Sequence, residues 1–201
     1  MVPNIHAFQV FSVNSHQAPT SPIIYLIRHG EKPPTQADGK DADGLSAQGL
    51  ERAQGLRKVF GKDSAYDIQY IIAEQPKEDG SRDRPYDTIL PLSQDLQLTP
   101  NTEIDRDDAK GAAAAAKSYS GPGNVLVCWE HGVLGHIVEK LGVKGKVKYP
   151  GDRFDIIWAV REPYETLEWV GSEGVEGLDE GEQEMPVPIV GGDGEGASED
   201  K

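Results

Sequence analysis

Two apolar runs in this chain each end in a His-Gly pair, and this repetition constrains the fold more than any other feature. Polar or small residues follow both runs: Arg28, His29 and Gly30 after residues 23–27, and Glu130, His131 and Gly132 after residues 125–129. Both runs are short and rich in β-branched or aromatic side chains, which is typical of buried strands. Ligands of open α/β sheets bind just beyond the carboxyl ends of such strands. The two runs therefore predict one site that contains both histidines.

Strand patterns alternate with helix patterns along the rest of the chain. We expect strands at 23–27, 66–73, 102–106 and 124–129, helices at 45–60, from 83, at 108–119 and at 132–141, and a hairpin of residues 154–160 and 164–170. Residues 74–80 are interpreted as an acidic loop. Such alternation favours a mostly parallel sheet covered on both faces. The predicted fold class is α/β, a three-layer αβα sandwich.

The length of 201 residues suits one domain with a full core. We expect an N-terminal arm at 1–22, an α/β domain at 23–170 and an acidic, glycine-rich tail at 171–201. The tail holds seven Glu and three Asp against one Lys, a composition typical of disordered segments.

Charge and composition exclude several classes of partner. A formal net charge of −14 argues against binding to nucleic acid or to anionic lipid. No apolar run is long enough to span a bilayer, and no secretory signal pattern is present near Met1. The single cysteine, Cys128, lies inside a strand pattern and is expected to be a buried thiol. These features predict a cytoplasmic protein, and the sequence leaves its oligomeric state open.

Four short motifs resemble those of the histidine phosphatase superfamily, which has the phosphoglycerate mutase-like fold. They are Arg28-His-Gly-Glu31, Leu45-Ser-Ala-Gln-Gly49, Arg84-Pro-Tyr-Asp-Thr88 and His131-Gly132, in the family's order. The resemblance implies a phosphatase without metal or cofactor that acts on a small phosphorylated substrate. In that case His29 attacks phosphorus and becomes a phosphohistidine, which water then hydrolyses. Arg28, Arg84 and His131 would surround the phosphate oxygens.

Elementary chemistry agrees with these roles. A neutral imidazole such as that of His29 is a competent nucleophile at neutral pH. The guanidinium groups of Arg28 and Arg84 present planar sets of donors that match phosphate oxygens. Gly30 lets the backbone approach a ligand closely. A helix that starts at Gly132 would also direct free N–H groups toward an anion. No His or Cys spacing in the chain indicates a metal site.

The proton donor for the leaving group is ambiguous in the sequence. One branch of the family places an acid after the second histidine, but Gly132 stands there. Many other members place a glutamate at a strand end after the second arginine, where this chain has Asp107 and Asp108 instead. Three alternatives stay open: Glu130 is the acid, Asp107 or Asp108 is the acid, or the chain has none.

The predicted function is that of a phosphatase-like hydrolase rather than a mutase. Mutases carry a larger insertion between the second arginine and the second histidine than the stretch from Arg84 to His131. The alternative is a non-hydrolytic member that binds an anionic ligand or catalyses a different reaction in the same pocket. Arg161 and Tyr164, at the hairpin turn, would reach the rim of the site if the preceding strand ran parallel to the core strands.

Overall fold

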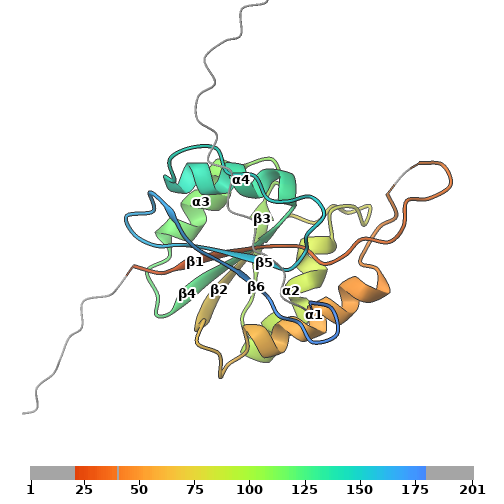
Figure 1. Cartoon of the computed structure of the whole chain (residues 1–201), viewed down its shortest axis with the longest axis horizontal. Helices are drawn as coiled ribbons and strands as arrows, with labels where there is room; N and C mark the ends of the chain where they lie inside the picture. Colours follow the sequence, from red (N-terminus) through yellow and green to blue (C-terminus); the bar gives the residue numbers. More distant parts are fainter. Residues whose placement is uncertain (1–20, 40, 180–201) are drawn as a thin grey trace, which may run out of the picture.

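A computed structural model describes residues 21–39 and 41–179 as one layered α/β body (Figure 1). Its elements in chain order are β1 (Ile24–Arg28), α1 (Ala47–Val59), β2 (Ile68–Glu74), α2 (Arg84–Leu96), β3 (Asn101–Ile104), α3 (Ala109–Ser118), β4 (Asn124–Trp129), α4 (His131–Leu141), β5 (Ile156–Val160) and β6 (Leu167–Ser172). The predicted strands and helices are all present, with ends shifted by a few residues.

The sheet has the strand order β3-β2-β4-β1-β5-β6. The first four strands in this order pair in parallel, whereas β5 pairs antiparallel with both β1 and β6. Because parallel strands end at the same edge, the segments that follow β1, β2, β3 and β4 meet there. The prediction that both His-Gly pairs share one sheet edge is therefore confirmed.

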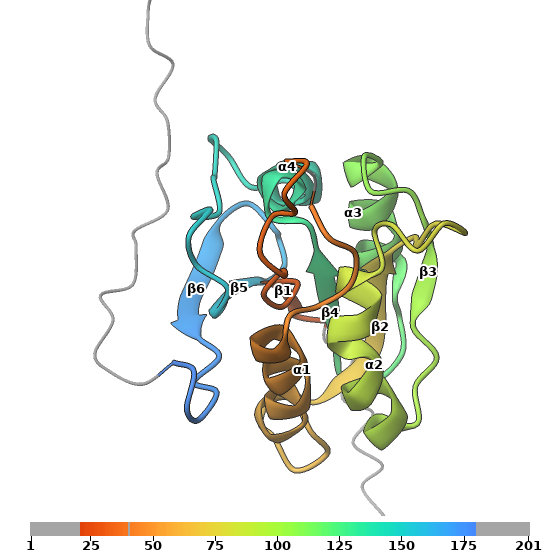
Figure 2. The same cartoon turned by 90° about the vertical axis from the view of Figure 1, so that its right-hand side faces the viewer.

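Helices cover both faces of the sheet, which confirms the three-layer sandwich (Figure 2). Helices α3 and α4 cover one face, where they pack on alternate strand residues such as Leu26 and Val127. Helices α1 and α2 cover the opposite face and pack on the intervening residues, among them Ile27 and Cys128. The continuous apolar runs of the central strands follow from this burial on both faces.

The hairpin is oriented differently from the arrangement that would bring its turn to the site. Strand β5 is antiparallel to β1, so Val160 lies level with Ile24, at the amino end of β1. Arg161 and Tyr164 consequently lie at the edge opposite to His29, and the Tyr164 hydroxyl donates a hydrogen bond to the Pro22 carbonyl at 3.0 Å. The expectation that Arg161 and Tyr164 border the site is wrong, because an apolar strand pattern carries no information on strand direction.

Two boundaries differ from those expected. Strand β2 includes Glu74, whose side chain is 2% exposed, so the acidic loop starts only after it. The packed α/β body also continues past residue 170, since β6 ends at Ser172 and both Glu173 and Val175 are buried. The predictions for the arm before residue 21 and for the tail beyond residue 179 lie outside the described residues. No helix in the described part of the chain has the length and apolar character needed to cross a membrane.

Candidate active site

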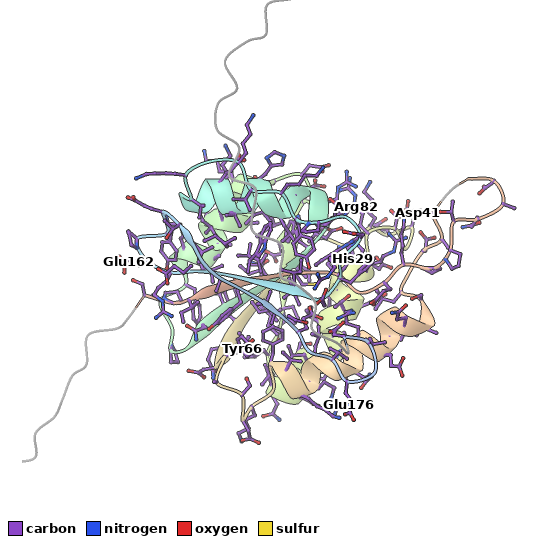
Figure 3. The ribbon with its side chains drawn as sticks, viewed as in Figure 1. His29, Asp41, Tyr66, Arg82, Glu162 and Glu176 are labelled. Atoms are coloured by element: carbon purple, nitrogen blue, oxygen red, sulfur yellow. The ribbon has the colours of Figure 1, made fainter. Side chains whose placement is uncertain are left out.

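The predicted site residues come from loops and helix starts at one edge of the sheet. His29 and Gly30 directly follow β1, and His131 opens α4 just after β4. Arg84 is the first residue of α2. Figure 3 shows His29 on the side of the molecule that also carries Asp41 and Arg82, away from Tyr66 and Glu162.

His29 is held as a neutral imidazole. Its side chain is buried, and its Nδ1 lies 2.7 Å from the Gly30 carbonyl oxygen. Because a carbonyl only accepts hydrogen bonds, Nδ1 carries the proton and the Nε2 lone pair remains available. Burial lowers the pKa of His29 to about 4; the hydrogen bond to Gly30 opposes this, while the charges of Arg28 and Arg84 add to it. The ring is therefore uncharged at neutral pH.

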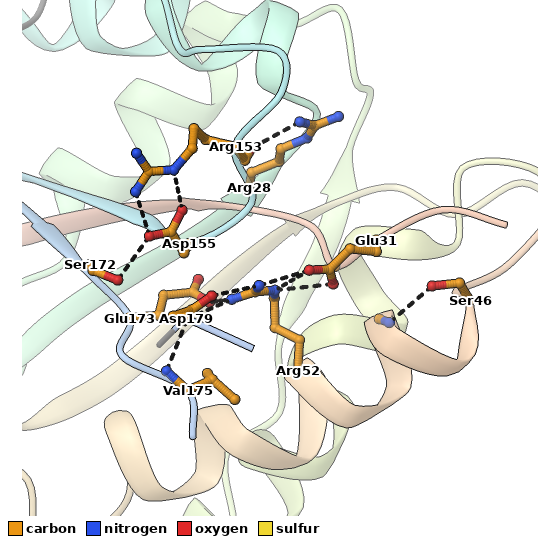
Figure 4. Close-up of polar contacts among 12 residues, drawn as sticks. Arg28, Glu31, Ser46, Arg52, Arg153, Asp155, Ser172, Glu173, Val175 and Asp179 are labelled. Carbon is orange, nitrogen blue, oxygen red and sulfur yellow. Dashed lines mark hydrogen bonds and ion pairs between the residues drawn. The ribbon is translucent and has the colours of Figure 1, made fainter. Parts of the chain in front are cut away.

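Arg28 is fixed by backbone carbonyls and an aromatic ring, yet its buried Nε–H is unpaired within the described chain. Its Nη1 donates to the Arg153 oxygen at 2.9 Å (Figure 4) and to the Gly151 oxygen at 2.8 Å. The guanidinium carbon lies 3.7 Å from the centre of the Phe154 ring. Its buried Nε–H has no hydrogen-bond partner among the described residues. An unpaired buried donor costs about 1–3 kcal/mol, which a bound acceptor would relieve.

Thr88 connects Arg84 to the backbone that follows His29. The Gly30 amide donates to the Thr88 hydroxyl oxygen at 2.8 Å, and this hydroxyl donates to the Arg84 carbonyl at 2.7 Å. These two bonds explain the four-residue spacing of the Arg84–Thr88 motif, because one helical turn brings the hydroxyl back to the carbonyl of Arg84.

The Arg84 guanidinium is bound by the loop that precedes α1. Its Nε donates to the Gly44 oxygen at 3.0 Å and its Nη2 donates to the Ala42 oxygen at 2.5 Å. The Asp41 carboxylate lies 4.0 Å from Nη1. The charge of Arg84 thus acts on His29 and lowers its pKa. Two donor nitrogens of Arg84 are nevertheless already bound to the loop.

His131 pairs with Glu130 at the start of α4. A Glu130 carboxylate oxygen lies 2.6 Å from His131 Nδ1, and the other accepts from the Gly132 amide at 2.8 Å. Burial alone would raise the pKa of Glu130, but these contacts outweigh it and lower the pKa to about 2. Glu130 is therefore ionised at neutral pH. The Gly132 amide is not free for an anion, contrary to the expectation for this helix start, because the Glu130 side chain caps it.

The two aspartates proposed as alternative acids are also engaged. Asp107 contacts Arg106 at 2.9 Å and Arg82 at 3.4 Å, and the hydrogen bond from Arg106 lowers the pKa of Asp107. The Asp108 carboxylate caps α3 by accepting from the Gly111 amide at 2.8 Å. These contacts give both aspartates a structural role that does not involve proton transfer.

The segment before β5 contributes residues that the sequence motifs did not reveal. Gly151 supplies a carbonyl to Arg28, and a Cβ atom placed on Gly151 would lie 3.5 Å from His131 Nε2. This segment therefore borders both Arg28 and His131. Phe154 contacts Arg28 and also lies edge-on to His29, with ring centres 6.2 Å apart. The only available signal was the aromatic start of an apolar run, which equally describes an ordinary strand.

Helix α1 is pressed against the backbone of the His29 loop at Gly49. A Cβ atom on Gly49 would lie 2.4 Å from the Glu31 carbonyl oxygen. The Ser46 side chain caps the helix by accepting from the Gly49 amide at 3.1 Å, and the Ser46 amide donates to the Glu31 carbonyl at 2.9 Å. The Leu45–Gly49 motif is therefore both a helix start and a support for the loop.

A buried arginine joins this support to the last of the described residues (Figure 4). Arg52 on α1 is 2% exposed and contacts three carboxylates: Glu31 at 2.7 Å, Glu173 at 2.7 Å and Asp179 at 2.9 Å. Burial alone would lower the pKa of Arg52, but hydrogen bonds to Glu31 and Asp179 outweigh it and raise the pKa. Burial raises the pKa of Glu173 to about 8.

Within residues 21–39 and 41–179, no cluster of His, Cys, Asp or Glu is suited to hold a metal ion.

Comparison with solved structures shows that the chain shares its fold with SixA-type histidine phosphatases. The protein histidine phosphatase SixA in complex with tungstate is 18% identical, with a TM-score of 0.53, over 75% of this chain and 97% of that one. A protein assigned as a phosphohistidine phosphatase SixA from Agrobacterium tumefaciens is 14% identical, with a TM-score of 0.52, over 77% and 98%. The sequence matches no protein-family model and no curated protein.

Proposed function

We propose that this chain is a phosphatase that transfers the phosphoryl group of a small phosphorylated substrate to Nε2 of His29. One observation carries the proposal. A neutral imidazole with a free nitrogen lone pair follows directly on Arg28, which holds a buried, unpartnered N–H donor. A nucleophile beside an unsatisfied cationic donor suits a tetrahedral oxyanion. Phosphoryl transfer needs chiefly such positioning and charge neutralisation.

The remaining groups have matching roles in this proposal. Arg28 and Arg84 neutralise the phosphate oxygens, and His131, oriented by ionised Glu130, donates to one of them. Gly30 lets the backbone stay close to α1, since a Cβ atom there would lie 3.0 Å from the Gly49 carbonyl oxygen. The tungstate of the SixA structure is an oxyanion similar in charge and shape to phosphate. The reaction in this proposal uses no metal ion.

The test is whether labelled phosphate from 4-nitrophenyl phosphate is trapped on the protein. Wild type should form an adduct that is stable to alkali and labile to acid, as a phosphohistidine is, and chelators should leave turnover unchanged. His29→Ala should abolish the adduct and lower turnover by about three orders of magnitude or more. His136→Ala is the matched control, because His136 is exposed on α4. Unchanged turnover in His29→Ala would refute the proposal.

A second function has one observation in its favour. Arg84 already donates to the carbonyls of Ala42 and Gly44, which leaves fewer of its donors to stabilise the transition state of phosphoryl transfer and favours binding without turnover. Binding of phosphate or vanadate to the wild type, with no adduct and no release of 4-nitrophenol, would select this binding function.

A further inference from the structure

Strand β2 ends in a buried carboxyl group that forms no ion pair with any described residue. Glu74 is 2% exposed, and its Oε2 accepts a hydrogen bond from the Glu130 amide at 3.1 Å. The other buried acidic side chains of the described residues all pair with arginine: Glu31 and Glu173 with Arg52, and Asp155 with Arg153. No ion pair to Glu74 exists in that part of the chain. A buried carboxylate without a cation is unfavourable, whereas a buried carboxylic acid is tolerated.

This carboxyl group lies at the sheet edge that carries the proposed nucleophile. Ala73 is level with Cys128 on β4, and Cys128 is level with Ile27 on β1. Glu74 and His29 therefore lie at the same edge of the sheet, one on each side of the end of β4. With adjacent strands about 4.8 Å apart, their main chains are separated by roughly 10 Å. A substrate bound between His29 and His131 would thus have Glu74 on the side of β2.

Charged groups from three neighbouring elements act on Glu74. Burial is the largest influence and raises the pKa of Glu74 to about 7; the charge of Glu130 adds to it, while Arg106 and Arg82 oppose it. The pKa of Glu130 is about 2. At neutral pH Glu74 is therefore partly protonated and Glu130 is ionised, although the Glu130 amide donates directly to the Glu74 carboxyl group. A pair whose environments separate the two pKa values in this way is suited to acid–base chemistry.

We propose that Glu74 supplies the proton that the leaving-group oxygen takes up, an inference that rests on the proposed phosphatase function. The lone pair of His29 Nε2 forms the N–P bond while the P–O bond to the leaving group breaks. The electron pair of that P–O bond stays on the leaving oxygen, which receives the proton of Glu74. Water then attacks the phosphohistidine, and its proton returns to the Glu74 carboxylate. Inorganic phosphate leaves, and His29 is again neutral.

The experiment replaces Glu74 by glutamine and varies the leaving group. Glu74→Gln keeps an acceptor for the Glu130 amide and nearly the same shape, but it has no proton to transfer. We expect kcat/KM for an alkyl phosphate to fall roughly 10²–10⁴-fold, the usual range for loss of a general acid. With 4-nitrophenyl phosphate, whose leaving group needs little protonation, kcat/KM should change by less than about threefold. In wild type, kcat/KM for the alkyl phosphate should fall as the pH rises above about 7, and in Glu74→Gln this fall should disappear.

Controls separate proton transfer from a structural role. Glu103→Gln removes an exposed carboxylate from β3 and should change neither substrate's turnover. Glu74→Asp retains an acid and should restore part of the alkyl phosphate activity. An equal loss on both substrates, or no loss on either, would overturn the proposal. If the wild type forms no phosphohistidine, the proposed function fails as well. If the adduct forms and Glu74→Gln shows no leaving-group dependence, only the role of Glu74 fails.

Discussion

At the scale of single residues, burial decides which side chains carry charge. The pKa of His29 is lowered to about 4 from its ordinary value of 6.5. Between these two values the unfolded chain binds a proton that the folded protein does not. The contribution of His29 to stability is therefore complete above about pH 6.5 and is lost as the pH falls toward 4.

A direct titration of the His29 ring checks this protonation state. NMR spectra recorded from pH 3 to pH 8 should show the ring signals of His29 titrating near pH 4, with His29→Ala used to identify them. Because burial is the main cause, the midpoint should change little with salt concentration. A midpoint near 6.5 would contradict the proposed neutral nucleophile.

Glu130 is expected to orient His131 rather than to donate a proton. In Glu130→Gln, the amide oxygen can still cap Gly132, whereas the charge next to His131 Nδ1 is lost. A hydrogen bond to a charged group contributes about 1.5–3 kcal/mol, which corresponds to a roughly tenfold to hundredfold loss in kcat/KM. The loss should be the same for aryl and alkyl phosphates. A loss confined to alkyl phosphates would make Glu130 the acid instead.

At the scale of elements, the position of the His29 loop depends on the first turns of α1. In Gly49→Ala the new methyl group would meet the Glu31 carbonyl at 2.4 Å, and rigid backbone on both sides cannot give way easily. Overpacking of this kind costs about 1–3 kcal/mol. Chemical denaturation should show this loss, together with reduced turnover. Gln48→Ala, at the exposed neighbouring position, should leave both unchanged; an equal effect there would argue against the contact.

The elements that the sequence predicted are those with a repeating pattern or a motif. The parallel core strands and the helices between them follow from apolar periodicity, and Arg28, His29, Arg84 and His131 follow from the resemblance. The burial of Glu74 at the end of β2 was missed because a charged residue at the end of an apolar run is normally interpreted as the start of a loop. The direction of β5 and the approach of Gly151 depend on long-range packing, which no local pattern encodes.

At the scale of the whole molecule, Arg52 links the site to a distant part of the chain. The residues after 170 were interpreted as tail because glycine and glutamate dominate there, yet Glu173 and Asp179 are both bound to Arg52. Composition describes an average over a segment. It cannot reveal that two of its carboxylates meet one buried cation from α1.

Removal of this cation should destabilise the protein strongly. Arg52→Ala would leave the buried carboxyl groups of Glu31, Glu173 and Asp179 without a cation, a change that costs about 3–5 kcal/mol. Arg57→Ala is the matched control on the same helix, since the pair of Arg57 with Asp95 is exposed and should contribute almost nothing. Urea unfolding of both variants at pH 7 measures the difference. Equal stabilities would show that the Arg52 cluster does not hold the body together.

The Arg52 cluster also has a consequence for the order in which the protein matures. During translation Arg52 is synthesised long before the carboxylates of Glu173 and Asp179, so its buried position cannot be completed until residue 179 has left the ribosome. Until Glu173 has been made, Glu31, two residues after His29, is the only one of these three acidic partners already present. The surroundings of the proposed nucleophile, although encoded near the start of the described chain, are thus finished last.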